Sequence, residues 1–184
     1  AEYRNEQHPF IVAGGPLTFR NPLPLAPFVD ALVMGEADQS EHEVFSVIFG
    51  SDSKDSAMRS LSGHPHVFVP SAHGDLLPPI DKTESATLPA YSQIITPHTE
   101  LRNMFLIEPE RGCHRGCTYC VMRRSTNDGM RIVKMDRVLS LIPDEAKRVG
   151  LVGAATTDHP QITEIVHALA DSGREVGLSS LRAD

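Results

Sequence analysis

The chain has 184 residues, 40% of them hydrophobic and 22% charged, an ordinary composition for one medium globular domain or two small ones. Its formal net charge is -7 and its isoelectric point is near 5.7, so no overall positive field would attract nucleic acid. No apolar run reaches the roughly 18 residues of a membrane span, and the start, AEYRNEQHPF, lacks a signal-peptide pattern. We expect a cytoplasmic protein without a membrane partner.

The first segment alternates between predicted strands and helices, which indicates an α/β fold. The apolar runs FIVAGG (10–15), DALVMGEAD (30–38) and HVFVP (66–70) predict strands, and the proline-rich residues 21–30 predict a short helix or turn. EHEVFSVIFG and SKDSAMRSLS predict two helices at 41–50 and 53–62. In the first of these, apolar residues recur at helical spacing: Val44, Phe45, Ile48 and Phe49.

A long stretch without periodicity follows at residues 71–102. It contains four prolines and no sustained pattern of apolar residues. A stretch of this length predicts a surface connector and a domain boundary. We therefore expect one domain at 1–70, a linker at 71–102 and a second domain at 103–184.

The second domain is predicted to be a series of βα units. The runs MFLIE (104–108), GLVGAA (150–155) and EVGLSS (175–180) predict buried strands. Helices are predicted at 135–149, where Pro143 should kink or split the helix, and at 162–173, with Gly173 as its stop. This order favours a parallel sheet with right-handed crossovers. The units are too few to close a barrel, so we expect the chain to be a fragment of a longer protein.

All three cysteines lie in RGCHRGCTYCVMRRS (111–125), with the spacing C-x3-C-x2-C. An odd, clustered set of thiols is unsuited to a disulfide framework and favours metal binding. On a cluster of four irons, three thiolates would leave one iron open, which is typical of a reactive rather than a structural metal site. The alternative is a non-catalytic zinc or electron-transfer module, with His114 as a fourth zinc ligand, although its position next to Cys113 strains tetrahedral geometry.

Four arginines flank these cysteines in an otherwise acidic chain. They would lower thiolate pKa values and stabilise an anionic cluster, or they are ordinary solvated loop charges. The four are Arg111, Arg115, Arg123 and Arg124.

The motif CHRGCTYC resembles the signature of the radical S-adenosylmethionine (radical SAM) superfamily, over residues 104–184. The resemblance implies a partial (β/α) barrel in which Cys113, Cys117 and Cys120 hold a [4Fe-4S] cluster and SAM chelates the fourth iron. Reductive cleavage of SAM then gives methionine and a 5′-deoxyadenosyl radical. It also implies an electron donor such as a flavodoxin or ferredoxin. The substrate is unknown, and methyl transfer to an unactivated carbon is one reaction of this class.

The same resemblance implies contacts with SAM. Tyr119 would lie near the adenine, and the end of the second predicted strand would meet the SAM amino group. There the family often carries a GGE-like stretch, whereas this chain reads GAATTD, so the acidic member is displaced or absent. Polar residues after the third strand would contact the carboxylate or ribose, unless they only cap the loop. The implied SAM contacts are Tyr119, Gly153, Ala154, Ser179, Ser180 and Arg182.

Residues 8–60 resemble the second half of the cobalamin-binding-type Rossmann domain that precedes many radical SAM domains. The implied cobalamin contacts are Gly14, Gly15, Gly35 and Glu36, and the alternative is that they form tight turns after two strands. The D-x-H-x-x-G sequence that supplies a histidine to cobalt in that family is absent from these residues. The loop TYCVMRR also resembles that of methylthiotransferases, but residues 1–112 lack the additional cysteines of that subtype.

Overall fold

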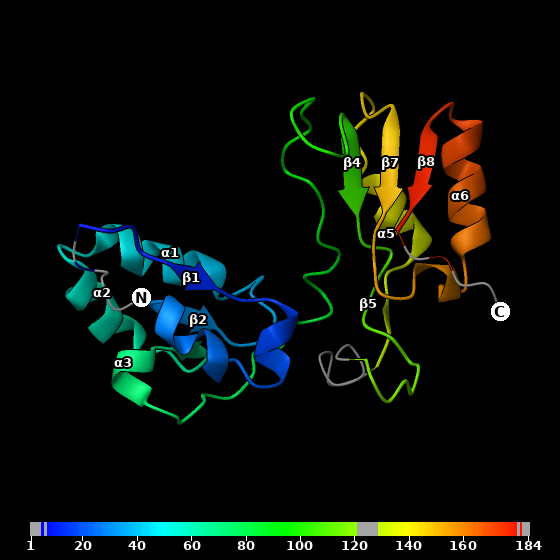
Figure 1. The fold of residues 1–184 in the computed structure, drawn as a ribbon. Coiled ribbons are helices and arrows are strands. Elements are labelled where there is room, and N and C mark those ends of the chain that lie inside the picture. Colours follow the sequence, from blue (N-terminus) through cyan, green and yellow to red (C-terminus); the bar gives the residue numbers. More distant parts are fainter. Residues whose placement is uncertain (1–4, 6, 121–128, 180, 182–184) are drawn as a thin grey trace. The chain divides into compact units, whose positions relative to one another are not determined.

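The structure is a computed structural model that describes residues 5, 7–120, 129–179 and 181. The chain divides into two compact units, residues 1–83 and 84–184. Each unit is a mixture of helices and strands built around a small sheet of its own (Figure 1).

The first unit contains a three-stranded sheet in the order β1-β2-β3. β1 runs parallel to β2, and β3 runs antiparallel to it. The predicted strands and helices of this segment are confirmed, whereas the reversed direction of β3 was not predicted. In chain order the elements are β1 (Val12–Ala13), η1 (Pro16–Phe19), η2 (Leu23–Phe28), β2 (Ala31–Val33), α1 (Glu41–Gly50), α2 (Lys54–Leu61), β3 (Val67–Phe68) and α3 (Pro70–His73).

Strand β2 is the centre of the first unit, because both of its faces are buried. Side chains of a strand alternate between its two faces. Ala31 and Val33 pack into a cluster with residues of α1 and α2, whereas Leu32 and the following Met34 pack against η2. The continuous apolar run of this strand is therefore explained by burial on both sides.

Helix α1 is confirmed, but its apolar residues do not all face the core. Val44 is buried, while Phe45 is 47% exposed and Phe49 is 83% exposed. The two phenylalanine rings stack on each other, with 6.1 Å between their centroids. Helical spacing identified the helix, but it did not tell which of its apolar side chains point into the core.

The second unit contains a three-stranded parallel sheet in the order β4-β7-β8, which confirms the predicted parallel sheet. A two-stranded antiparallel ladder, β5-β6, lies beyond the end of β4. In chain order the elements are β4 (Met104–Ile107), β5 (Glu110–Arg111), β6 (Arg131–Ile132), α5 (Met135–Ser140), β7 (Arg148–Leu151), η3 (Thr156–Asp158), α6 (Ile162–Asp171) and β8 (Glu175–Leu178).

The parallel sheet is covered by helices on one face. Phe105 and Ile107 of β4 lie on this face and join the core that α5 and α6 contribute to. The opposite face carries Leu106 and, in register with it, Gly150 and Gly177. On this second face Met104, Leu106 and Gly177 are half-buried and Gly150 is buried.

The helix predicted at 162–173 is confirmed, whereas the helix predicted at 135–149 forms only over its first part, because the chain leaves the helix before Pro143 and residues 148–149 join β7. Helix α5 ends at Ser140, three residues before Pro143, as expected of a residue that cannot continue a helix. Helix α6 ends in a Schellman motif, in which Gly173 has φ +77° and donates to the Ala170 carbonyl while Arg174 donates to the Leu169 carbonyl.

Part of the predicted linker lies against the sheet of the second unit. Residues 90–92 run antiparallel to the end of β4, where Tyr91 pairs with Ile107 and the Ser92 amide donates to the Leu106 carbonyl at 2.8 Å. The Ser92 hydroxyl accepts from the Leu106 amide at 2.9 Å. These contacts cover the end of the open edge of β4, where a foreign strand could otherwise pair.

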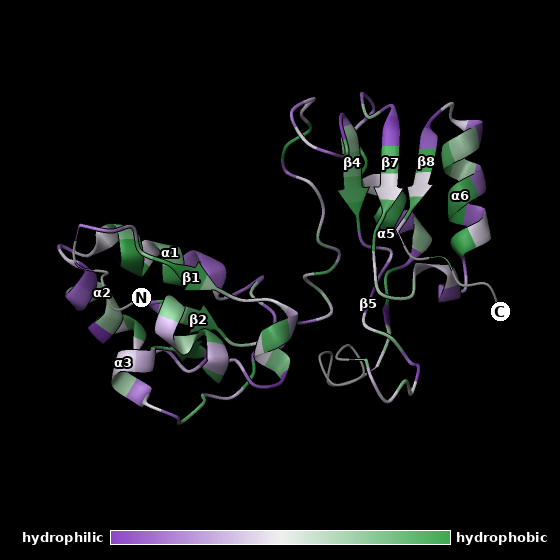
Figure 2. Ribbon diagram, viewed as in Figure 1, coloured by the Kyte–Doolittle hydropathy of each residue, from purple (hydrophilic) through white to green (hydrophobic). Residues whose placement is uncertain are grey.

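Figure 2 shows that hydrophobic residues gather in the middle of β4 and β7 and along α6. In the first unit β2 is also hydrophobic, whereas α6 carries hydrophilic residues between its hydrophobic ones (Figure 2). Within the described ranges, no helix combines the length and the apolar character needed to traverse a lipid bilayer.

Candidate functional site

The cysteine loop joins β5 to β6 and follows the carboxyl end of β4. This is the edge at which parallel α/β sheets place their sites. Gly112 has φ +95°, a conformation that glycine adopts without strain, and it turns the chain from β5 into the loop. The loop therefore begins from a fixed point at the site edge of the sheet.

The three cysteines form no disulfide. Cys113 and Cys120 are half-buried and Cys117 is exposed. The Arg115 amide donates to the Cys113 sulfur at 3.4 Å, and the Cys120 amide donates to the Cys117 carbonyl at 3.2 Å. Among the described residues, no three His, Cys, Asp or Glu side chains are grouped so that they could hold a metal ion. The donor set nevertheless fits an iron-sulfur cluster, because thiolates on one short loop are the usual ligands of iron in such clusters.

The arginines next to the cysteines are engaged with carboxylates. Arg111 donates two hydrogen bonds to Glu108, at 2.9 and 2.8 Å. Arg115 approaches Asp158 of η3 at 3.3 and 3.4 Å, so the loop is tied to the turn after β7. Arg123 and Arg124 lie outside the described residues.

His114 also faces Asp158 rather than the thiols. Its Nε2 atom lies 3.8 Å from a carboxylate oxygen of Asp158. This placement does not favour the alternative of a zinc site that uses His114 as the fourth ligand.

Glu110 is a member of the site that the sequence did not reveal. It lies at the start of β5, three residues before Cys113, and its side chain is fully buried. One carboxyl oxygen accepts a hydrogen bond from the Ala155 amide at 2.9 Å. Burial raises the pKa of Glu110 from 4.5 to about 7, against the lowering effect of this hydrogen bond, and the nearby charges of Glu108 and Asp158 raise it further.

The predicted SAM contacts after β7 and β8 are brought together in part. Ser179 accepts from the Gly153 amide at 3.1 Å, so the ends of the two strands are linked. Ala154 follows Gly153 in the same turn, whereas the Tyr119 side chain is 90% exposed in the cysteine loop. Ser180 and Arg182 lie outside the described residues. Whether any of these residues contacts SAM stays a prediction.

The predicted cobalamin contacts in the first unit take part in its internal packing. Gly15 and Gly35 have φ of +83° and +97°. A Cβ on Gly35 would lie 2.3 Å from the Asp81 carbonyl oxygen, so only glycine allows this approach. Glu36 is buried and accepts from the Thr83 amide at 2.9 Å, while Gly14 lies at the end of β1. These contacts agree with the alternative of tight turns, and cobalamin contact stays a prediction.

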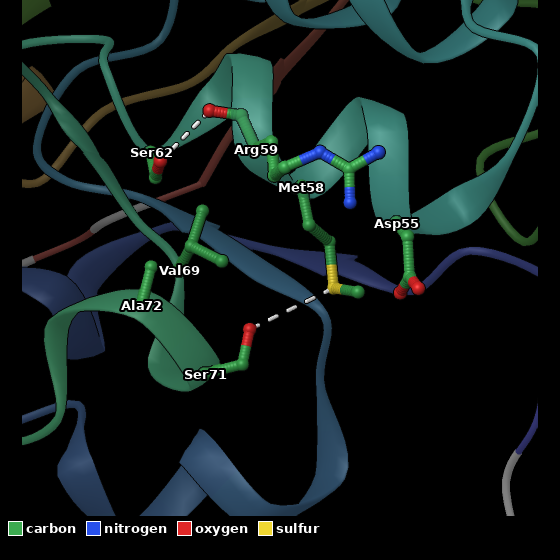
Figure 3. Close-up of a pocket in the computed structure, with 7 residues that line it drawn as sticks. All are labelled: Asp55, Met58, Arg59, Ser62, Val69, Ser71 and Ala72. Atoms are coloured by element: carbon green, nitrogen blue, oxygen red, sulfur yellow. Dashed lines mark hydrogen bonds between the residues drawn. The ribbon is translucent and has the colours of Figure 1, made fainter.

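A pocket of about 280 Å³ lies in the first unit, between α2 and α3 (Figure 3). Asp55 and Arg59 of α2 line it, and Ser71 donates to the sulfur of Met58 at 3.9 Å. None of the residues that the sequence predicted for a site contributes to this pocket.

The comparisons with known proteins agree with the cysteine motif. Residues 1–70 match a family model described as "Radical SAM proteins, N-terminal". The chain is similar to the uncharacterized protein MJ0966 of Methanocaldococcus jannaschii, with 27% identity over 188 aligned residues. The alignment covers 98% of this chain and 39% of that relative, so the chain spans about two fifths of its relative's length. No solved structure matches the chain.

The family match and the cysteine motif lie in different parts of the chain, residues 1–70 and 113–120, and point to the same superfamily. The mixed α/β architecture with a parallel sheet is compatible with this assignment. Residues 1–70 therefore resemble the N-terminal region of radical SAM proteins, and this match supports membership of the radical SAM superfamily.

Proposed function

We propose that this protein is a radical SAM enzyme in which Cys113, Cys117 and Cys120 ligate a [4Fe-4S] cluster. The observation that carries the proposal is the set of three free cysteines on one loop at the carboxyl edge of a parallel sheet. A bound cluster supplies the electron that cleaves SAM to methionine and a 5′-deoxyadenosyl radical. Three protein ligands leave one iron open for SAM.

The loop is anchored at its base, and metal binding would complete its structure. β5 and β6 pair through Glu110 with Ile132 and Arg111 with Arg131, which fixes both ends of the segment that contains the cysteines. Metal sites are rarely preformed without their ligand, because binding and local folding are coupled. Among the described residues no preformed group of three metal ligands is found, as expected of a loop that closes around its cluster.

The edge formed by the ends of β7 and β8 is the proposed SAM site. Gly153 and Ala154 would offer backbone groups to the amino group of SAM, and Tyr119 would cover its adenine. Ser179 supports this role because it already joins the two strand ends through Gly153. Ser180 and Arg182, which follow it, are proposed to bind the carboxylate or ribose.

The architecture of the second unit supports a place in a partial (β/α) barrel. The outer wall of such a barrel carries the helices and the inner wall carries only side chains. The sheet β4-β7-β8 has this asymmetry, with α5 and α6 on one face and glycines on the other. We propose that residues 103–184 form the first βα units of that barrel and that residues 1–70 form part of a Rossmann-like domain.

Anaerobic reconstitution of the whole protein with iron and sulfide tests the proposed function. The expected results are an absorption band typical of a [4Fe-4S] cluster and, after addition of dithionite and SAM, formation of 5′-deoxyadenosine. A protein that shows neither would refute the proposal. In the cell we expect a reduced flavodoxin or ferredoxin of the cytoplasm to replace dithionite.

A pair of variants in the loop provides the control. Cys117→Ser removes one proposed ligand and should abolish cluster binding, whereas Thr118→Ala changes the adjacent residue and should leave it intact. Metal analysis separates the non-catalytic alternative. One zinc per chain, or a cluster whose spectrum ignores SAM, would favour a metal-binding or electron-transfer module.

Cobalamin binding by the first domain and methyl transfer as the reaction are finer proposals. Titration with hydroxocobalamin under reducing conditions tests the first, because ligation of cobalt by the protein shifts the visible spectrum. An unchanged spectrum would leave the chain as a radical SAM protein without cobalamin. Methyl transfer would then lose its support as well.

A further inference from the structure

Glu110 links two segments that are far apart in the sequence and meet at the proposed site. It precedes Gly112 and Cys113 on one side, and its carboxyl group reaches the turn after β7 on the other. The Ala155 amide donates to this carboxyl group at 2.9 Å. One buried side chain therefore connects the base of the cysteine loop with the turn that follows the central strand.

Gly153 makes this contact possible, because a side chain there would collide with the carboxyl group. A Cβ atom built on Gly153 would lie 2.2 Å from Oε1 of Glu110 and 3.0 Å from its carboxyl carbon. The turn thus presents bare backbone to Glu110. The same Cβ atom would lie 3.1 Å from the hydroxyl of Thr156, so Glu110 and Thr156 both border Gly153.

The burial of Glu110 against the turn after β7 costs free energy. Both Glu110 and Thr156 are fully buried, and within the described part of the chain Oε2 of Glu110 and Oγ1 of Thr156 have no hydrogen-bond partner. Leaving a buried polar atom unpaired is unfavourable, and native proteins concentrate such features at functional sites. An apolar side chain would fill this position at lower cost if packing were its only purpose.

A second carboxylate, that of Asp158, also connects the cysteine loop with the turn after β7, at a more exposed position. Asp158, two residues after Thr156, faces Arg115 and His114 of the cysteine loop. These contacts are more exposed than that of Glu110 and are individually weak. The loop is therefore tied to the turn after β7 at an inner point by Glu110 and at an outer point by Asp158.

We propose that Glu110 is a positioning residue that holds the cysteine loop and the turn 153–156 at a fixed distance, so that cluster and SAM meet. This inference rests on the proposed function. In this proposal Glu110 binds neither the cluster nor SAM; it sets the distance between the segments that bind them. Loss of the carboxyl group should weaken SAM binding while the three thiols still bind iron.

The test measures cluster content and SAM affinity separately in the reconstituted whole protein. Glu110→Ala should keep the iron and sulfide content and the SAM-free electron paramagnetic resonance spectrum of the wild type. Its Kd for SAM should rise about tenfold or more, the size of effect usual for residues that orient metal ligands. Glu110→Gln keeps an oxygen for the Ala155 amide and should stay close to the wild type.

Gly153→Ala disturbs the same contact, between the Glu110 carboxyl group and the turn after β7, by a change in the turn. Its methyl group should displace the carboxyl group and raise the Kd as Glu110→Ala does, and the double variant should be no worse than either single one. Val138→Ala, a core change in α5 of the same unit, serves as a control that lowers stability and should leave the Kd unchanged.

Two outcomes would overturn the inference while the proposed function stands. One is a Kd for Glu110→Ala or Gly153→Ala equal to that of the wild type. The other is a Kd for Val138→Ala raised as much as that of Glu110→Ala. If the wild-type protein binds no cluster, or its cluster ignores SAM, the proposed function itself has failed.

Discussion

The sheets of the two units bury their strands differently. β2 of the first unit is covered on both faces, by α1 and α2 on one side and by η2 on the other. β7 of the second unit is covered by helices on one face, and its other face carries Gly150. A strand enclosed on both sides serves packing alone. On the second face of β7 the side chains of Met104 and Leu106 lie over Gly150, so in the part of the chain that the structure describes β7 is covered there by its neighbouring strand and not by a helix.

The largest loss of stability should come from a cavity in β2, the strand that is buried on both faces. Leu32→Ala removes a fully buried side chain of β2 and should cost about 3 kcal/mol, because the cavity cannot be filled from either side. The matched change Leu106→Ala, on the face of β4 opposite α5 and α6, should cost less than half as much. Hydrogen exchange followed by mass spectrometry measures each unit separately. Equal losses would contradict the distinction between the two sheets.

The stability of the second unit should depend on pH because of the buried carboxyl group of Glu110. The folded-state pKa of Glu110 is about 7 against an ordinary 4.5, so the folded state binds this proton more tightly than the unfolded state. The associated stability is complete below pH 4.5 and is lost as the pH rises to about 7. The loss is on the order of 3 kcal/mol.

The measurement compares the wild type with Glu110→Gln by urea denaturation in the same buffers. The stability difference between the two should change across this range in favour of Glu110→Gln as the pH rises. A constant difference would show that Glu110 does not titrate there.

Substitution by alanine should change stability differently at Gly150 and Gly177, the two glycines on the sheet face opposite α5 and α6. A Cβ atom on Gly150 would lie 2.6 Å from Leu106 and 2.8 Å from Met104, so Gly150→Ala should cost about 1–3 kcal/mol. On Gly177 the nearest atom, of Met104, would lie at 3.5 Å, an ordinary contact. Gly177→Ala should be neutral or slightly stabilising. Thermal unfolding of both variants tests this, and similar melting temperatures would count against it.

A small loss of stability should come from the outer connection of the loop. Asp158→Asn weakens the contacts with Arg115 and His114 and should cost less than about 1 kcal/mol, because these groups are partly exposed. Amide exchange in residues 113–120 should nevertheless become faster. Unchanged exchange in this loop would mean that Asp158 does not restrain it.

The regular elements could be predicted from the sequence because their signals are local. Gly173 stops α6 as its local signal predicts, and the apolar run of β2 predicts burial, whereas the helix predicted to continue past Pro143 to residue 149 ends at Ser140. The ladder β5-β6 was missed because each strand has two residues and the cysteine loop separates them. Glu110 was missed for a related reason. A glutamate is usually exposed, and only the approach of Gly153 from a distant segment makes its burial possible.

The odd number of free cysteines in the loop has a consequence for handling the protein in air. Cys117 is exposed, so oxidation begins at an accessible sulfur. A disulfide between two of the three cysteines would remove two of the proposed cluster ligands at once and leave the third thiol of the loop unpaired there. That remaining thiol can then link two molecules together. The history of exposure to oxygen, and not only the sequence, would therefore decide whether a given preparation can bind the proposed cluster.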